Sequence, residues 1–306
     1  MTAYAIEVSA ASKRFGETVA VRDVTLQIGR GEIFAIVGPD GAGKTTLLRL
    51  LCGALVPDGG SLRVDGVDVA RRPQAVQSVI GYMPQRFSLY PDLSVRENLR
   101  FYGAIFDVPS REFEERAAQL LEDFALSAFA SRLADQLSGG MKQKLALACA
   151  LIHSPATILL DEPTAGVDPV SRRAFWRILS TVHANGTTIL LTTAYMDEAE
   201  RADRVAFMAH GSILSFGEPA SLKTSMGGDV IEIAGVERAA ARRALRAEES
   251  VRSIEIFGDT LHALVASADE SLPRIRTRLS AAGLEQARLR RIQPSLEDAF
   301  VARLAS

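Results

Sequence analysis

The segment GPDGAGKTT at residues 38–46 constrains the fold of this chain more than any other. It fits the pattern G-x-x-x-x-G-K-[ST] and lies between an apolar run at residues 33–37 and a helical pattern that begins at Lys44. Glycines let consecutive backbone N–H groups turn toward one anion, and the amino end of a following helix adds positive potential. The segment therefore predicts a phosphate-binding turn between a buried strand and a helix.

The residue types in this turn also indicate what it binds. Lys44 would reach the β- and γ-phosphates of a nucleotide, and the Thr45 hydroxyl would ligate Mg²⁺. Only five of the 35 cationic residues are lysines, so chance rarely places one here.

Short apolar runs alternate with helical patterns in the first two thirds of the chain. The runs at residues 156–160 and 187–191 precede helical patterns at 169–183 and 195–201. This alternation predicts an α/β core of parallel strands covered by helices. Further strands, expected in an antiparallel portion, are 5–9, 19–28 and 61–64. Residues 94–106 and 110–124 have helical patterns and indicate a helical subdomain at about residues 86–140.

The composition changes after Gly227 and Gly228. Strand patterns occur at residues 229–234, 251–257, 260–266 and 284–291, and helical patterns occur at 236–247 and 269–282. The order β-α-β-β-α-β predicts the split unit of ferredoxin-like α+β folds, followed by a last helix at 295–304. We therefore expect two domains, at residues 1–226 and 227–306.

The composition excludes several classes of protein. Lysine plus arginine number 35 against 37 acidic residues, so no basic field favours a nucleic-acid partner. Cys52 and Cys149 lack a paired motif, which argues against a disulfide framework or a cysteine metal site and fits a reducing cytosol. Neither a signal peptide nor a run of about 20 apolar residues is present, so any membrane span is expected in another subunit.

A pair of carboxylates follows the apolar run at residues 158–160. Asp161, at the carboxyl end of the expected strand, can hold Mg²⁺, and Glu162 can polarise an attacking water as a general base. Such a pair before a proline is, alone, most often a solvated turn. Its position in a chain that carries a phosphate loop favours the catalytic interpretation.

A third motif, LSGGMKQ at residues 137–143, precedes Asp161 at the start of an expected helix. The order of phosphate loop, Gln85, LSGG and Asp-Glu resembles the ATP-binding cassette (ABC) family across about residues 5–220. The resemblance implies a P-loop cassette with a mixed sheet, and a head-to-tail dimer that sandwiches two ATP molecules. In that dimer Ser138 and the backbone of Gly139 and Gly140 contact a γ-phosphate held by the other copy. Taken alone, the segment could be a Gly-Gly helix cap.

The resemblance assigns further roles by position. Phe15 matches the aromatic residue that stacks on adenine, although a core phenylalanine is the alternative. Gln85 matches the glutamine that touches Mg²⁺ and the attacking water, and Asp168 matches the residue that joins the two monomers. The ATP contacts implied are Phe15, Gly38, Pro39, Asp40, Gly41, Ala42, Gly43, Lys44, Thr45 and Thr46. The magnesium ligands implied are Thr45, Gln85 and Asp161, and the signature residues acting in trans are Ser138, Gly139, Gly140 and Gln143.

Two positions depart from the family pattern. Similar proteins place a histidine that contacts the γ-phosphate at the position of Ala194, and alanine has no donor. Losing one charge-stabilising donor costs a factor of about 10²–10³ in rate, so we expect a slowed ATPase. Asp40 stands where asparagine is more usual, and its carboxylate is expected to weaken phosphate binding unless the side chain points away from the phosphates.

The segments at residues 141–150, 195–200 and 293–300 look like those of bacterial ABC exporters of the drug- and antibiotic-resistance type. The resemblance implies a cytoplasmic chain, peripheral on the inner face of the cell membrane, that powers export through a separate permease. It implies a second cassette, identical or different, and contact between the permease and residues 83–99, for which simple core packing is the alternative.

Two other functions compete with this one. The first is a nucleotide-dependent clamp with little or no turnover, acting as the regulatory half of a cassette pair. The second, a soluble cassette acting in translation or DNA repair, is disfavoured because the chain has one cassette and no basic tail. The arginines at 288, 290 and 291 form either a solvated face, a lipid or dimer contact, or a regulatory surface.

Overall fold

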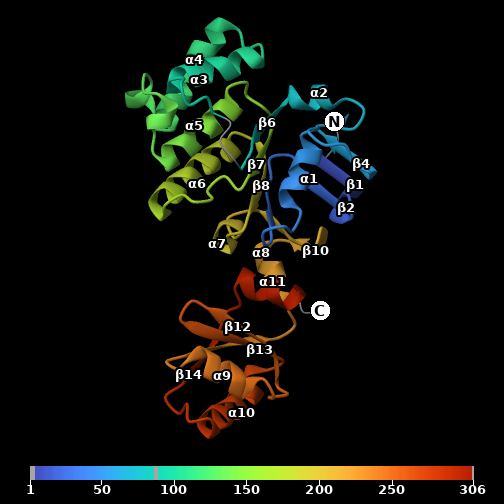
Figure 1. Cartoon of the computed structure of the whole chain (residues 1–306), viewed down its shortest axis with the longest axis vertical. Helices are drawn as coiled ribbons and strands as arrows, with labels where there is room; N and C mark the ends of the chain where they lie inside the picture. Colours follow the sequence, from blue (N-terminus) through green and yellow to red (C-terminus); the bar gives the residue numbers. More distant parts are fainter. Residues whose placement is uncertain (1–3, 86–88, 305–306) are drawn as a thin grey trace. The chain divides into compact units, whose positions relative to one another are not determined.

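The computed structural model describes residues 4–85 and 89–304 (Figure 1). By its internal contacts the chain divides into two compact units, Met1–Ile213 and Leu214–Ser306. The expected domain boundary at residue 226 stays a prediction. None of the helices formed by the described residues is both long and apolar enough to cross a membrane.

A six-stranded sheet has the order β10-β9-β3-β8-β7-β6, and all of its strands except β10 lie wholly within the first unit. Its strands are β3 (Ile33–Val37), β6 (Ile80–Met83), β7 (Thr157–Asp161), β8 (Thr188–Thr193), β9 (Arg204–Ala209) and β10 (Ser212–Gly217). Strand β3 is parallel to β8 and β9, and β7 is parallel to β6 and β8. Every residue of β3, β7 and β8 is buried, as expected for a parallel sheet that is covered on both faces.

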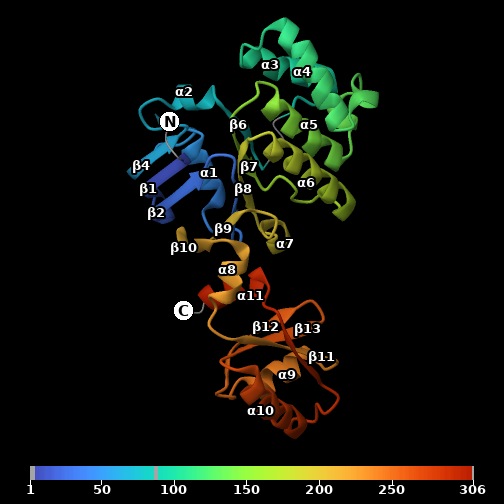
Figure 2. The ribbon, with the colours of Figure 1, turned by 180° about the vertical axis from the view of Figure 1, so that it is seen from behind.

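Helices cover both faces of this sheet, as Figures 1 and 2 show. Helix α1 lies on one face, and α5 and α6 lie side by side on the other. The helices of the core are α1 (Lys44–Leu51), α2 (Pro73–Gln77), α5 (Gly139–Leu151), α6 (Pro169–Ala184) and α7 (Met196–Ala199). The predicted α/β core is confirmed, although α7 is shorter than the helix expected at residues 195–201.

The sequence predicts an antiparallel portion, and an antiparallel sheet is present, with β2 and β4 in contact with α1. Its order is β2-β1-β4-β5, with β1 (Tyr4–Phe15), β2 (Thr18–Gly29), β4 (Gly59–Val64) and β5 (Val67–Asp68). Strand β1 pairs antiparallel with both β2 and β4. One buried cluster joins this sheet to α1 and the central sheet, and it includes Ile6, Val8, Leu26, Ile28, Phe34, Leu47, Leu48 and Leu50.

The segment between the central strands β6 and β7 is helical. It contains α3 (Val95–Ile105), α4 (Ser110–Asp123) and 3₁₀ turns at Ser127–Phe129 and Ala134–Gln136. Ser94 and Glu97 form a capping box that starts α3, because each side chain accepts a hydrogen bond from the other's backbone N–H.

The second unit has the predicted ferredoxin-like topology. Its sheet has the order β12-β13-β11-β14, and all neighbouring strands are antiparallel. The elements are α8 (Pro219–Thr224), β11 (Asp229–Ala234), α9 (Arg238–Leu245), β12 (Val251–Phe257), β13 (Thr260–Val265), α10 (Ala268–Ala281), β14 (Arg288–Ile292) and α11 (Leu296–Leu304).

The last strand of this sheet begins later than the sequence predicts. Residues 284–287 were expected in a strand, but the N–H of Leu284 bonds the carbonyl of Leu279, and that of Ala287 bonds the carbonyl of Leu284. Both side chains are buried. The segment therefore has the apolar pattern that is typical of a strand, although its backbone forms turns.

Two arginines of β14 are paired with acidic residues of β11. Arg290 lies 3.1 Å from Glu232, and Arg291 lies 2.8 Å from Asp229. This pairing fits the interpretation of a solvated face.

Candidate functional site

The phosphate loop connects the carboxyl end of β3 to α1. Its glycines are required by close approaches: a Cβ on Gly38 would lie 2.0 Å from the carbonyl oxygen of Met208. A Cβ on Gly43 would lie 2.2 Å from the carbonyl oxygen of Ala20, and Gly43 has a φ of +105°. The loop can therefore pack this tightly only with glycine at both positions.

Lys44 is buried at the centre of the loop, with 4% of its surface exposed. Its Nζ donates to the carbonyl oxygens of Gly38 at 2.7 Å and Pro39 at 3.1 Å, and lies 3.1 Å from Glu162 Oε1. Glu162 Oε2 accepts a hydrogen bond of 2.8 Å from Gln85 Nε2. Three predicted site residues from distant parts of the sequence therefore meet in one cluster.

A second cluster surrounds Asp161. Its Oδ1 accepts hydrogen bonds from Thr45 Oγ1 at 3.0 Å and Thr192 Oγ1 at 2.8 Å, whereas its buried Oδ2 has no partner. Burial raises the pKa of Asp161 above its ordinary value, although the hydrogen bonds from Thr192 and Thr45 act in the opposite direction. A buried carboxylate oxygen without a partner is an open ligand position.

Thr192 was missed by the sequence analysis. It lies opposite Asp161 in the parallel register of β7 and β8. Both its carbonyl oxygen, at 3.1 Å, and its Oγ1, at 3.0 Å, accept from the backbone N–H of Glu162. These bonds hold Glu162 at a φ of +48°, a left-handed conformation that is uncommon for residues other than glycine. A threonine at the end of an apolar strand was the only signal for this role.

The loop and the carboxylate clusters border a cavity of about 400 Å³. Its lining residues are Thr18, Val19, Ala20, Asp40, Gly41, Ala42, Gly43, Lys44, Thr45, Thr46, Gln85 and Glu162. The oxygens near it, from a threonine, an aspartate and a glutamine, are the hard donors that Mg²⁺ prefers. Among the described residues no three His, Cys, Asp or Glu side chains form a metal cluster.

The signature residues lie apart from this cavity, at the start of α5. Ser138 caps the helix, its Oγ accepting from the N–H of Met141 at 3.4 Å. The space around the Cα of Gly139 is open, whereas a Cβ on Gly140 would lie 2.6 Å from Ser171 Oγ on α6. Gln143 follows on α5 and is half-buried. None of these four residues lines the described cavity around Lys44.

The remaining predicted residues are at the surface. Phe15 ends β1, is 49% exposed and has Lys13 Nζ 5.8 Å from its ring centroid. Asp168 starts α6: its Oδ1 accepts from the N–H groups of Val170 and Ser171, each at 3.0 Å, and hydrogen bonding lowers its pKa. Ala194 follows β8 and is exposed.

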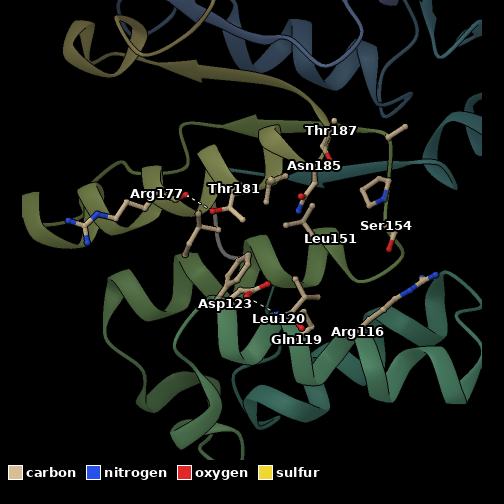
Figure 3. Close-up of a pocket in the computed structure, with 16 residues that line it drawn as sticks. Arg116, Gln119, Leu120, Asp123, Leu151, Ser154, Arg177, Thr181, Asn185 and Thr187 are labelled. Atoms are coloured by element: carbon tan, nitrogen blue, oxygen red, sulfur yellow. Dashed lines mark hydrogen bonds between the residues drawn. The ribbon is translucent and has the colours of Figure 1, made fainter.

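A second cavity, of about 650 Å³, lies between α4, α5 and α6 (Figure 3). Leu120 of α4 and Leu151 of α5 point into the space between the helices, and Arg116 and Arg177 extend outward at the rim. The other apolar lining residues are Phe124, Pro155, Ala156, Ile178 and Val182. This cavity has an apolar floor and a polar rim, and contains no glycine-rich phosphate loop.

The sequence is similar to those of known ATP-binding proteins. The family model described as ABC transporter matches residues 21–165. The chain is 37% identical over 306 residues to the daunorubicin resistance ATP-binding protein DrrA2 of Streptomyces coeruleorubidus, covering 98% of this chain and 95% of that protein. It is 38% identical over 303 residues to the Nod factor export ATP-binding protein I of Rhizobium sp. (strain N33), covering 98% and 97%.

Another relative is the probable multidrug ABC transporter ATP-binding protein YbhF of Escherichia coli (strain K12). The identity is 41% over 224 residues, which is 73% of this chain. The chain spans 39% of the length of YbhF.

Solved structures show the same fold. A structure of the ATP-binding subunit of an ABC transporter aligns with a TM-score of 0.67 at 30% identity, covering 72% of this chain and 93% of that one. A dimeric ATP-binding cassette in a post-hydrolysis state, bound to ADP and Pi, aligns with a TM-score of 0.64 at 26% identity, covering 70% and 98%. The sequence identity over nearly the whole chain, the shared fold and the phosphate-loop geometry together show that this chain belongs to the ABC transporter family, as an ATP-binding cassette.

Proposed function

We propose that the chain is an ATPase subunit that powers export through a separate membrane permease. The observation that carries the proposal is the cluster in which Lys44 contacts Glu162 and Glu162 contacts Gln85, beside Asp161 and Thr45. One cavity therefore has beside it a cation that can bind phosphates, oxygen atoms that can bind a metal, and a carboxylate that can activate water. Hydrolysis of ATP to ADP and phosphate requires this combination of groups.

Each of these residues has a chemical role in the proposed reaction. The backbone N–H groups of the loop and the ammonium of Lys44 bind the β- and γ-phosphates. Thr45, Asp161 and Gln85 would hold Mg²⁺, which neutralises charge on the phosphate oxygens when bound. Glu162 orients the attacking water and accepts its proton as general base.

A second cassette would complete the site. The open space at Gly139 and the amino end of α5 leave backbone N–H groups available to a γ-phosphate from a partner copy. Phe15, half exposed, would stack on adenine, and Asp168 would contact the partner near the start of α6. The partner is either an identical or a different cassette.

The permease would contact the helical segment of the cassette. The cavity between α4 and α6 offers an apolar floor and polar rim to a cytoplasmic helix of that subunit. Within the expected contact at residues 83–99, residues 86–88 lie outside the described chain. Tyr90 is 45% exposed, whereas Val95 and Leu99 are buried and serve the core.

This proposal places the chain in the cytoplasm, on the inner face of the cell membrane. The printed names of two relatives refer to daunorubicin resistance and Nod factor export, which supports an exporter and leaves the cargo of this chain unassigned. The missing donor at Ala194 would slow turnover. The alternative is therefore a clamp that closes on ATP with negligible hydrolysis, as the regulatory half of a pair.

Turnover of Mg-ATP by the purified chain with its permease tests the proposal. We expect turnover that depends on Glu162, and Leu120→Arg in the second cavity should reduce stimulation by the permease while basal turnover persists. Turnover at background with the permease present, unchanged by Glu162→Gln, would overturn the ATPase proposal in favour of the clamp.

A further inference from the structure

Glu198 is a buried carboxylate that no role proposed above uses. It lies in α7 with 1% of its surface exposed. Its Oε1 accepts a hydrogen bond from Thr164 Oγ1, and its Oε2 accepts one of 2.9 Å from Thr193 Oγ1. Arg172 of α6 supplies the countercharge, with its Nε 3.5 Å from Oε1. Both threonines are buried as well, so these contacts are shielded from water.

The two threonines lie beside the proposed reaction centre, Thr164 in the turn after β7 and Thr193 at the end of β8. Thr164 lies two residues after Glu162, in a turn where the N–H of Ala165 bonds the carbonyl of Glu162 and the N–H of Val167 bonds that of Thr164. This turn leads to Asp168. Glu198 therefore fixes the turn that begins at the proposed general base and ends at the proposed dimer contact.

Thr193 immediately precedes Ala194. Its Oγ1 donates to Glu198 and also accepts from the N–H of Tyr195 at 3.0 Å. This second bond closes a turn around Ala194. The guanidinium carbon of Arg172 lies 4.1 Å from the centroid of the Tyr195 ring. Contacts with Glu198 and Arg172 therefore fix the positions of Thr193 and Tyr195. Ala194, which lies between them, has no side-chain donor of its own.

We propose that Glu198 is a positioning residue that holds the Glu162 turn and the 193–195 loop in one arrangement. Because Ala194 cannot anchor its loop to a phosphate, the bond from Thr193 to Glu198 sets the position of that loop. Glu198 acts through Thr164 and Thr193, because only 1% of its own surface is exposed. This inference rests on the proposed ATPase function and adds a residue to it.

The test compares variants that remove single contacts at constant side-chain size. Glu198→Gln removes the charge, and Thr164→Val and Thr193→Val each remove one donor, whereas Thr164→Ser and Thr193→Ser keep it. We expect the first three to lower kcat about tenfold or more and to leave the KM for ATP nearly unchanged, because the ATP contacts lie elsewhere. The serine variants should restore most of the lost kcat.

Asp197→Asn is the matched control. Asp197 is the adjacent carboxylate, has 72% of its side chain exposed and lies 3.7 Å from Arg172 without a bond to either threonine. We expect its kcat to stay within about twofold of the unmodified chain. Each rate is divided by the concentration of sites that bind ATP and is measured well below the Tm of the variant. A variant that is partly unfolded therefore does not appear as one with a low kcat.

The outcomes separate this inference from the proposed function. If the unmodified chain hydrolyses ATP and Glu198→Gln has the same kcat, the positioning role is wrong. Equal losses in the serine and valine variants would also overturn it, because the hydroxyls would not matter. If the unmodified chain does not turn over even with its permease, the proposed function fails. ATP-driven dimerisation is then the readout, and Glu198→Gln should weaken it about tenfold, with no change overturning the inference.

Discussion

Lys44 and Glu162 form an ion pair that is largely shielded from solvent, with 4% and 11% of their side chains exposed and 3.1 Å between Nζ and Oε1. The phosphate-binding cation and the proposed general base are therefore in direct contact. Removing either partner leaves the other charge poorly solvated and unpaired. A substitution at one of the two residues therefore also lowers the stability of the fold.

Replacing the base while keeping its shape separates binding from chemistry. Glu162→Gln should lower Mg-ATP turnover about 10²-fold or more, because glutamine cannot accept a proton from water. Binding of ATP should persist, since the loop N–H groups and Lys44 are intact, and equilibrium binding with a fluorescent ATP analogue checks this. Glu249→Gln, an exposed acid in the second unit, is the control. Unreduced turnover in Glu162→Gln would show that another group activates the water.

Restoring the missing donor should accelerate the reaction. Ala194→His places an imidazole N–H near the position of the γ-phosphate, and we expect turnover to rise about tenfold or more if this donor limits the rate. Steady-state phosphate release measures the effect. Ala194→Leu adds similar bulk without a donor and should not accelerate turnover. Equal rates in the histidine variant and the unmodified chain would contradict the idea that the missing donor limits hydrolysis.

The buried acid Asp161 should make stability depend on pH. Its raised pKa means that the folded state favours the protonated form, so its stabilising contribution is present below pH 3.8 and is lost as pH rises through the raised value. At pH 7 the ionised carboxylate then destabilises the fold. Asp161→Asn should therefore raise Tm relative to the unmodified chain, by an amount that grows from pH 4 to pH 7.

Thermal unfolding with a chelator and without nucleotide measures this difference. The exposed Asp92→Asn variant should show a difference in Tm that is near zero and constant with pH. A difference for Asp161→Asn that stays constant across the range would rule out the charge as the cause.

Asp298 should give the opposite pH dependence in the second unit. Burial raises its pKa, but hydrogen bonds from His262 at 2.8 Å and from Ser295 outweigh this, and the pKa lies below the ordinary value of 3.8. Its contribution to stability is therefore present above pH 3.8 and is lost as pH falls through the lowered value. Asp298→Asn should destabilise by about 1–3 kcal/mol at neutral pH, and by less in acid.

Urea unfolding followed by a probe in the second unit would measure this change. Asp259→Asn, in the exposed turn between β12 and β13, is the control for charge removal alone. If both variants lose the same stability at every pH, the buried bonds of Asp298 are not responsible.

Several elements could be predicted because their signals are local. The phosphate loop, α1 and the strand before it follow from glycine spacing and apolar runs within 20 residues. The β-α-β-β-α-β order of the second unit is likewise visible as periodicity. Strands β6, β9 and β10 were not predicted. Strand β6 has only four residues, and only two residues separate β9 from β10. Their apolar patterns are therefore too short or too close together to be recognised as separate strands.

The sequence by itself determined the cassette class, the phosphate loop with Lys44 and Thr45, and the candidate acids Asp161 and Glu162, because each motif is contiguous. Only the tertiary structure decided which of these residues touch. The parallel order β3-β8-β7 brings Thr192 opposite Asp161, and α7, which packs against β3 and β8, places Glu198 against Thr164. These contacts join residues about 30 positions apart in the sequence. Their partners depend on strand order and register, which local propensity does not encode.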